Sequence, residues 1–205
     1  MEFYWILIVW GILIQSLDLA KVISFTDERP EGSGAKLDSE SGTYEEGDFT
    51  ICLDKYITSI NGFINLVFSD DFALAIPIAQ DKLILQFKGI WYYAFNVPNI
   101  EPFTWGTVCF SYTLKMHKIR LAYRGQIYLS KTDPELLGKR DIGENFFSNF
   151  ILGRKDNTGT FMGKLSRFSV WGAAGDDKSL KDASDCLGRP NRMNLGKLYF
   201  IYFKF

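Results

Sequence analysis

Two stretches of this chain have the alternating pattern of a strand, with an apolar stripe on one side and a cysteine on the other. In residues 105–112 (WGTVCFSY) an apolar stripe takes one face of an extended strand and Cys109 lies on the opposite face. Residues 49–53 (FTICL) repeat the pattern, with Cys52 opposite the stripe. If the two strands are antiparallel neighbours, the register that aligns both stripes brings Cys52 opposite Cys109, which is the geometry that a disulfide needs.

Further short apolar runs, bounded by turn residues, predict a series of strands with no long helical segment between them. Asn61-Gly62 and Arg124-Gly125 lie between such runs and suit tight reversals. The regular spacing predicts an all-β sandwich of antiparallel strands. The expected strands are 21–26, 48–56, 63–68, 72–78, 82–88, 91–97, 105–113, 117–123, 126–130, 146–152 and 162–171.

Three segments depart from simple alternation. The polar, glycine-rich stretch 27–47 is either a long loop or a pair of edge segments. In the strand 162–171, Leu165 is out of phase with its neighbours, so a β-bulge near Ser166 is expected to return it to the core. Residues 176–184 fit one short helix with Asp176 as its cap.

Composition excludes some classes of protein. The chain is 47% hydrophobic and 16% aromatic, with 18 Phe and 10 Tyr, which argues against disorder and favours strands. The formal net charge is −1 and the charges are interspersed, so no basic block indicates a nucleic-acid partner.

Residues 1–20 differ from the rest because residues 3–14 are almost wholly apolar. This run is shorter than the roughly 20 apolar residues of a membrane span, and it favours a cleaved secretory signal. An uncleaved anchor and a buried segment are the alternatives, because Glu2 and Asp18 fit a signal poorly. The sequence therefore predicts a secreted protein, tethered to a membrane only if the segment is retained, with no other membrane insertion.

An exported protein would fold where cysteine pairs are oxidised, which supports the Cys52–Cys109 bond. Cys186 is then left to pair with a missing segment, to pair with another chain, or to stay free. After it the pattern changes, and the aromatic tail 188–205 is either a final strand or a sequence foreign to the domain. The expected organisation is a signal at 1–20, one domain at 21–187 and the tail at 188–205.

Five motifs in order resemble those of pentraxin-like and laminin-G-like domains. The cysteine half-motifs are moderately specific, and the ILG…G-x-L-x-x-F-x-V-W ending is the most specific part. The resemblance implies a concanavalin A-like jelly roll of two antiparallel sheets, and in pentraxins the two matching cysteines form one bond. The motifs are FTICL (49–53), WGTVCFSY (105–112), IRLAYRGQ (119–126), FILGRKD (150–156) and GKLSRFSVWG (163–172).

The resemblance implies a non-enzymatic module that binds extracellular glycans or proteins, often with calcium. The family places an acid and an amide where this chain has Arg154 and Lys155, and two cations would repel a divalent ion. No calcium cofactor is therefore expected. A weaker single site could use only Asp81, Asp156 and Asn157.

Catalytic patterns are absent from the sequence. No Glu-x-Asp-x-x-Glu run supplies the paired carboxylates of a retaining glycosidase, and Asp48 lies in an incomplete acidic cluster. The only histidine, His117, is flanked by cations and reads as a solvated edge residue. No zinc spacing or phosphate loop appears.

A ligand surface is predicted at three consecutive aromatic residues. Trp91 and Tyr93 share one face of their strand and Tyr92 takes the other, so one face could stack on a sugar ring. The alternative is that Trp91 and Tyr93 belong to the core. Trp91, Tyr93, Asp156 and Asn157 are thus the candidate ligand-binding residues. The leading hypothesis is a glycan-binding or other extracellular recognition module, and the alternative is a protein-interaction domain of a larger adhesive or receptor protein.

Overall fold

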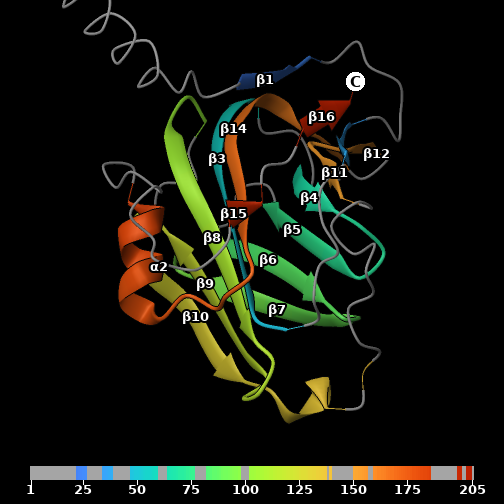
Figure 1. Ribbon diagram of the computed structural model, residues 1–205. Coiled ribbons are helices and arrows are strands. Elements are labelled where there is room, and N and C mark those ends of the chain that lie inside the picture. The colour runs from blue at the N-terminus through green and yellow to red at the C-terminus, as the bar shows by residue number, and fades with distance from the viewer. Residues whose placement is uncertain are drawn as a thin grey trace, which may run out of the picture.

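The computed structural model describes residues 22–26, 34–38, 47–59, 64–76, 82–97, 102–137, 139, 150–156, 159–185, 198–199 and 202–204. Within this part of the chain, two antiparallel sheets pack face to face, with one α-helix on the outside (Figure 1). The all-β sandwich predicted from the sequence is confirmed. The predicted signal at 1–20, Asn61-Gly62, Cys186 and most of the tail lie outside the described residues. Among the described residues no helix is long and apolar enough to cross a bilayer.

The first sheet has the order β1-β14-β3-β8-β9-β10, and β15 also pairs with β14. Its strands are β1 (Val22–Phe25), β3 (Phe49–Ser59), β8 (Trp105–Thr113), β9 (Lys118–Tyr123), β10 (Gln126–Thr132), β14 (Met162–Trp171) and β15 (Leu198–Tyr199).

The second sheet has the order β16-β2-β11-β4-β5-β6-β7. Its strand β2 lies within the polar stretch 27–47 and pairs on both sides, with β11 and β16, so this part of the stretch is neither a loop nor an edge segment. Its strands are β2 (Ala35–Asp38), β4 (Ile64–Phe68), β5 (Phe72–Ile76), β6 (Lys82–Phe87), β7 (Ile90–Phe95), β11 (Ile151–Leu152) and β16 (Tyr202–Lys204). A small separate ladder joins β12 (Lys155–Asp156) to β13 (Gly159–Thr160), and η1 (Pro134–Leu136) is a short 3-10 helix.

The predicted pairing of the two cysteine strands is confirmed. Strands β3 and β8 are antiparallel neighbours in the register that sets Cys52 opposite Cys109, and a disulfide joins these two residues. The apolar stripes of both strands face the second sheet, so the bond lies on the outer face of the first sheet.

Aromatic side chains fill the space between the sheets. Phe110 of β8 contacts Phe72 of β5 at 5.3 Å and Phe87 of β6 at 5.4 Å between ring centroids. Phe49 of β3 lies 5.6 Å from Phe110, and all four rings are fully buried. Because these contacts join strands of both sheets, the sandwich has one continuous core.

The predicted bulge in β14 is also confirmed. The register of β14 against β3 shifts between Ser166 and Ser169, and Arg167 between them has a φ of 46°. The shift lets Leu165 and Val170 both enter the core, where each is 1% exposed. Arg167 is turned to the outer face and forms an ion pair with Asp54.

The predicted helix is α2 (Asp177–Ser184), which covers part of the outer face of the first sheet (Figure 1). The Asp176 side chain caps it by accepting a hydrogen bond from the Ser179 N–H at 2.7 Å. Leu180 and Ala183 pack against the disulfide.

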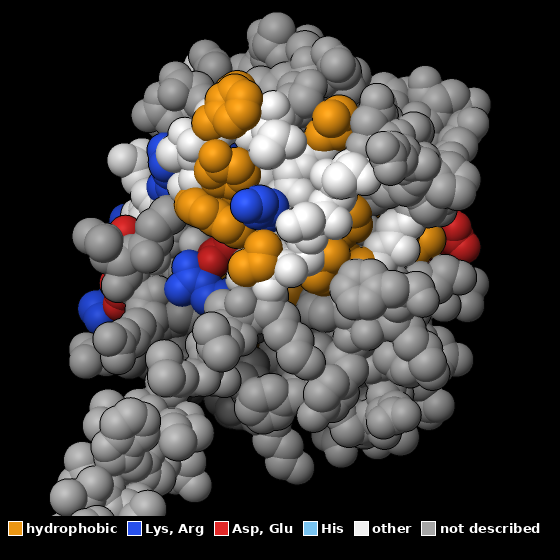
Figure 2. Space-filling view, turned by 90° about the horizontal axis from the view of Figure 1, so that it is seen from above, with side chains coloured by type: hydrophobic (Ala, Val, Ile, Leu, Met, Phe, Trp, Pro, Cys, Tyr) orange, Lys and Arg blue, Asp and Glu red, His pale blue; other side chains and the backbone are white. Residues whose placement is uncertain are grey.

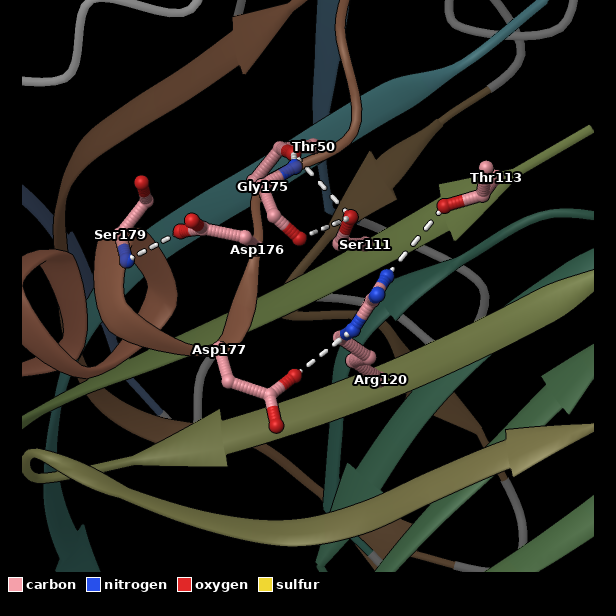
Figure 3. Close-up of polar contacts among 8 residues, drawn as sticks. All are labelled: Thr50, Ser111, Thr113, Arg120, Gly175, Asp176, Asp177 and Ser179. Carbon is pink, nitrogen blue, oxygen red and sulfur yellow. Dashed lines mark hydrogen bonds and ion pairs between the residues drawn. The ribbon is translucent and has the colours of Figure 1, made fainter.

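Polar contacts hold the start of α2 on the sheet (Figure 3). The Thr50 hydroxyl accepts a hydrogen bond from the Gly175 N–H at 2.8 Å, and Arg120 donates to Asp177 at 2.8 Å. Arg120 also donates to the Thr113 hydroxyl at 3.2 Å. The start of α2 is thus held directly by β3 and β9, and Thr113 of β8 holds Arg120 in turn.

Tight turns connect neighbouring strands. Arg124-Gly125 joins β9 to β10 with φ values of 46° and 76°, as the sequence predicted. Lys88-Gly89 joins β6 to β7 with almost the same angles, so the predicted strand 82–88 ends one residue earlier, at Phe87. Most other predicted bounds differ from the observed ones by a few residues. Of the predicted strand 146–152, residues 146–149 lie outside the described residues, and β11 forms its last part.

Candidate functional site

An aromatic stripe runs along the outer face of β7, the last strand of the second sheet. Its members are Trp91, Tyr93 and Phe95, whose exposed fractions are 48%, 45% and 62%. Tyr92 and Ala94 point the other way and are buried. The alternative that Trp91 and Tyr93 belong to the core is therefore wrong. Phe95 was missed, although the same alternation places it on the face of Trp91 and Tyr93.

The stripe has polar neighbours on the adjacent strand β6. The register places Gln86 beside Trp91 and Lys82 beside Phe95. The ammonium of Lys82 lies 5.8 Å from the centroid of the Tyr93 ring, and the rings of Tyr93 and Phe95 are stacked at 6.2 Å. This arrangement offers flat apolar faces for stacking, with a cation and an amide within reach of a ligand's polar groups.

An ion pair between the buried carboxylate of Asp133 and the half-exposed ammonium of Lys131 lies behind β7. The carboxylate of Asp133, whose side chain is 3% exposed, accepts hydrogen bonds from the Lys131 ammonium and the Glu135 N–H, both at 3.0 Å. Burial would raise the pKa of Asp133, but these hydrogen bonds outweigh it and hold the pKa below its ordinary value. The Lys131 ammonium lies 5.6 Å from the centroid of the buried Tyr92 ring. The inner side of β7 is therefore tied to the end of β10.

The phenol of Tyr92 lies near the same ion pair of Lys131 and Asp133. Burial raises the pKa of Tyr92 well above its ordinary value, and the negative charge of Asp133 raises it further. The phenol therefore stays protonated at any physiological pH. Tyr92 is 5% exposed, so its ring packs in the core on the side of β7 opposite the stripe.

Of the three calcium candidates, only Asp156 belongs to the described part of the chain. Asp156 lies in the short ladder of β12 and β13, and Asp81 and Asn157 fall outside the described part. The guanidinium of Arg154 lies 4.1 Å from the centroid of the Phe68 ring, so it stacks on the second sheet. Within the described ranges, no group of three His, Cys, Asp or Glu could hold a metal ion.

His117 and Asp48, which were considered as catalytic residues, both make polar contacts with other parts of the chain. Nδ1 of His117 lies 3.2 Å from the Tyr112 hydroxyl, and His117 is half-buried. The expectation of a solvated edge residue is thus only partly right. The carboxylate of Asp48 accepts a hydrogen bond from the Leu114 N–H at 2.7 Å, which fixes the turn after β8.

A second exposed cluster lies at the end of the sandwich near β1, where hydrophobic side chains surround a basic one (Figure 2). The ring of Tyr56 lies 5.3 Å from that of Trp105 and 5.9 Å from the Lys164 ammonium. Trp105 is 39% exposed. Unlike the stripe on β7, this cluster is assembled from separate strands, and an ion pair of Arg167 with Asp54 lies on the same face of the sheet.

The fold resembles those of solved structures of other proteins. The structure resembles that of a native heptameric SAP-like pentraxin from Limulus polyphemus, with a TM-score of 0.59 at 15% identity over 90% of this chain and 94% of that one. The fold is pentraxin-like. No family model and no curated protein sequence matches the chain.

Other solved structures share the pentraxin-like fold. One is the CBM40 of the Ruminococcus gnavus IT-sialidase bound to α2,3 sialyllactose, with a TM-score of 0.59 at 17% identity over 81% of this chain and 97% of that one. Another is domain 4 of AbnA, a GH43 extracellular arabinanase from Geobacillus stearothermophilus, in complex with arabinotriose. There the TM-score is 0.53 at 13% identity over 80% of this chain and 87% of that one. At such identities the likeness establishes the fold and leaves the ligand to the site itself.

Proposed function

We propose that this protein is a non-enzymatic recognition module that binds a glycan on the aromatic stripe of β7. The observation that carries the proposal is the outward orientation of Trp91, Tyr93 and Phe95 on a strand whose inner face is firmly packed. Exposed aromatic residues in a contiguous row are unusual on a monomer surface and mark binding sites. Two structural neighbours in complex with saccharides, sialyllactose in one and arabinotriose in the other, agree with this choice of ligand class.

The spacing of the stripe suits a chain of sugar rings. Residues two apart on a strand are about 6.6 Å apart, since each residue advances ~3.3 Å. The apolar face of a pyranose can therefore lie on one ring while the next sugar reaches the neighbouring ring. Lys82 and Gln86 on β6 would then donate hydrogen bonds to hydroxyl or acidic groups at the rim of the site.

The site would work without calcium. Stacking and hydrogen bonds from β6 and β7 need no divalent ion, and the Arg154 guanidinium places a positive charge at the motif where the related family has calcium ligands. Glycan affinity is thus expected to be the same with calcium and with a chelator. An extracellular setting, which the disulfide supports, is part of the proposal.

The test is binding to a glycan array, followed by calorimetric titration of the saccharide that gives the strongest signal. Trp91→Ala is expected to weaken binding by about tenfold, because an aromatic contact contributes roughly 0.5–1.5 kcal/mol beyond the area it buries. Trp105→Ala is the matched control, since it removes an exposed tryptophan from the other sheet.

Loss of binding in Trp105→Ala only would assign the glycan site to the cluster around Tyr56 and overturn the assignment to β7. Equal loss in both variants would show that the effect is not specific to the stripe and would overturn the assignment as well. No signal on any array would favour the alternative, a protein-interaction domain of a larger adhesive or receptor protein. Titration of the array hit with and without a chelator decides the calcium question in the same experiment.

A further inference from the structure

The strand that carries the aromatic stripe also ends its sheet. Within the described ranges, strand β7 pairs only with β6, starting from Phe87 opposite Ile90 at the hairpin. In an antiparallel ladder, successive residues point their N–H and C=O groups alternately toward the partner strand and away from it. Counted from the hairpin, Trp91, Tyr93 and Phe95 direct theirs away from β6. None of these three makes a further hydrogen bond to the described part of the chain.

The outer edge of β7 lacks the features that prevent an edge strand from pairing with a strand of another molecule. Proteins protect such edges with charged residues, proline or a bulge. The last strand of the other sheet, β10, has both a charge, Lys131, and a shift in register between Ile127 and Leu129. Strand β7, with the sequence IWYYAF, has no charged residue and no proline, and its register with β6 is unbroken. As far as the described strands go, this edge is therefore open to another strand.

The sequence of β7 is complementary to itself. With two copies antiparallel and Tyr93 opposite Tyr93 of the partner subunit, Trp91 faces the partner's Phe95 on the outer side. On the inner side the large Tyr92 meets the small Ala94 of the partner subunit. Cross-strand aromatic pairs stabilise antiparallel sheets by roughly 0.2–1 kcal/mol each, and without charges on the strand no like charges are opposed. A second copy of this chain thus fits the edge in size, in polarity and in register.

We propose that two copies of this protein pair through β7 to form a symmetric dimer with one continuous sheet. The pairing uses backbone groups at the edge, so it does not depend on glycan binding by the outer face. Such an interface is isologous, because the same surface serves both copies. It would also join the two aromatic stripes into one band that crosses the dimer axis.

Cysteine cross-linking tests the register directly. With Cys186 changed to Ser, Tyr93→Cys is expected to give a covalent dimer under mild oxidation without any saccharide, because the two Tyr93 positions would lie about 5.5 Å apart between Cα atoms. Phe103→Cys is the matched control, since Phe103 is exposed at the other end of the sandwich. Trp91→Cys is expected to cross-link only when combined with Phe95→Cys. A monomeric Tyr93→Cys protein, or equal cross-linking of the Phe103→Cys control, would overturn the proposal.

Sedimentation equilibrium measures the same association in the native chain. The native protein is expected to show a concentration-dependent dimer, and Phe95→Lys to weaken its association by at least about tenfold, since lysines would then oppose aromatic residues across the edge. Phe103→Lys should leave the dimer unchanged, and circular dichroism verifies that both variants are folded. A native chain that stays monomeric at every soluble concentration, or an equal effect of both substitutions, would contradict pairing through β7.

Discussion

At the scale of single residues, the most informative side chain is Asp133, because it is charged and almost fully buried. Its carboxylate is held by the Lys131 ammonium and by the Glu135 N–H at the start of η1. The residue also donates its own N–H to the carbonyl oxygen of His117 at 3.0 Å. Asp133 thus joins the end of β10 to the turn before β9, behind the strand that carries the candidate site.

The lowered pKa of Asp133 predicts how stability depends on pH. A carboxyl group whose pKa is lower in the folded than in the unfolded chain stabilises the fold above its unfolded pKa, about 3.9, and loses that contribution as pH falls through the folded value. Asp133→Asn is therefore expected to lower the free energy of unfolding by about 1–3 kcal/mol at neutral pH. The difference from the native chain should shrink below about pH 3.9, as measured by denaturant titration.

Asp182→Asn serves as the control for this measurement. Asp182 pairs with Lys178 on the exposed side of α2, and both side chains are mostly exposed. Pairs of this kind contribute roughly 0–1 kcal/mol, so little change is expected at any pH. A gap between Asp133→Asn and the native chain that stays constant down to acid pH would show that the ionised carboxylate is not its cause.

At the scale of elements, α2 and the disulfide form one unit on the outside of the first sheet. Cys52 and Cys109 are 2% and 0% exposed, and Trp171, Leu180 and Ala183 belong to the same apolar cluster. A reductant must reach a sulfur atom to attack it, so the docked helix limits the rate of reduction. The contacts of Figure 3 that hold α2 thereby also protect the bond.

Leu180→Ala is expected to speed reduction of the Cys52–Cys109 bond. The substitution removes a fully buried side chain, which costs about 2–5 kcal/mol and loosens the docking of α2. The appearance of free thiols after addition of dithiothreitol measures the rate, under conditions in which circular dichroism verifies a native fold. Lys178→Ala, on the exposed side of the same helix, should match the native rate. An unchanged rate in Leu180→Ala would mean that the helix does not shield the bond.

Some of the strands and turns could be predicted from the sequence alone, and others could not. Alternation predicted β3, β8, their register and the disulfide, because a strand with one apolar face leaves little freedom in pairing. The out-of-phase Leu165 predicted the bulge in β14 for the same reason. Boundaries were less accurate, and Lys88-Gly89 was missed because a lysine in a turn with positive φ carries no strong signal.

The candidate site was predicted only in part. Alternation grouped Trp91 with Tyr93, but Tyr92 between them is aromatic too, so neither face of the strand looked more polar than the other. Which face meets the core depends on how β7 pairs with β6 and packs on the first sheet, and those contacts are distant in sequence. The support from Asp133, about forty residues further along the chain, depends on the same long-range packing.

At the scale of the whole molecule, the single core predicts that the two sheets unfold together. Phe110 of the first sheet contacts Phe72 and Phe87 of the second, so neither sheet keeps a buried face without the other. Phe110→Ala is expected to lower the free energy of unfolding by about 3–5 kcal/mol. Hydrogen exchange followed by mass spectrometry should then show an equal loss of protection in β8 and in β5. Phe103→Ala, at an exposed position, is the control and should change neither the free energy of unfolding nor the protection of either strand. Loss of protection confined to the first sheet would mean that the two sheets unfold independently.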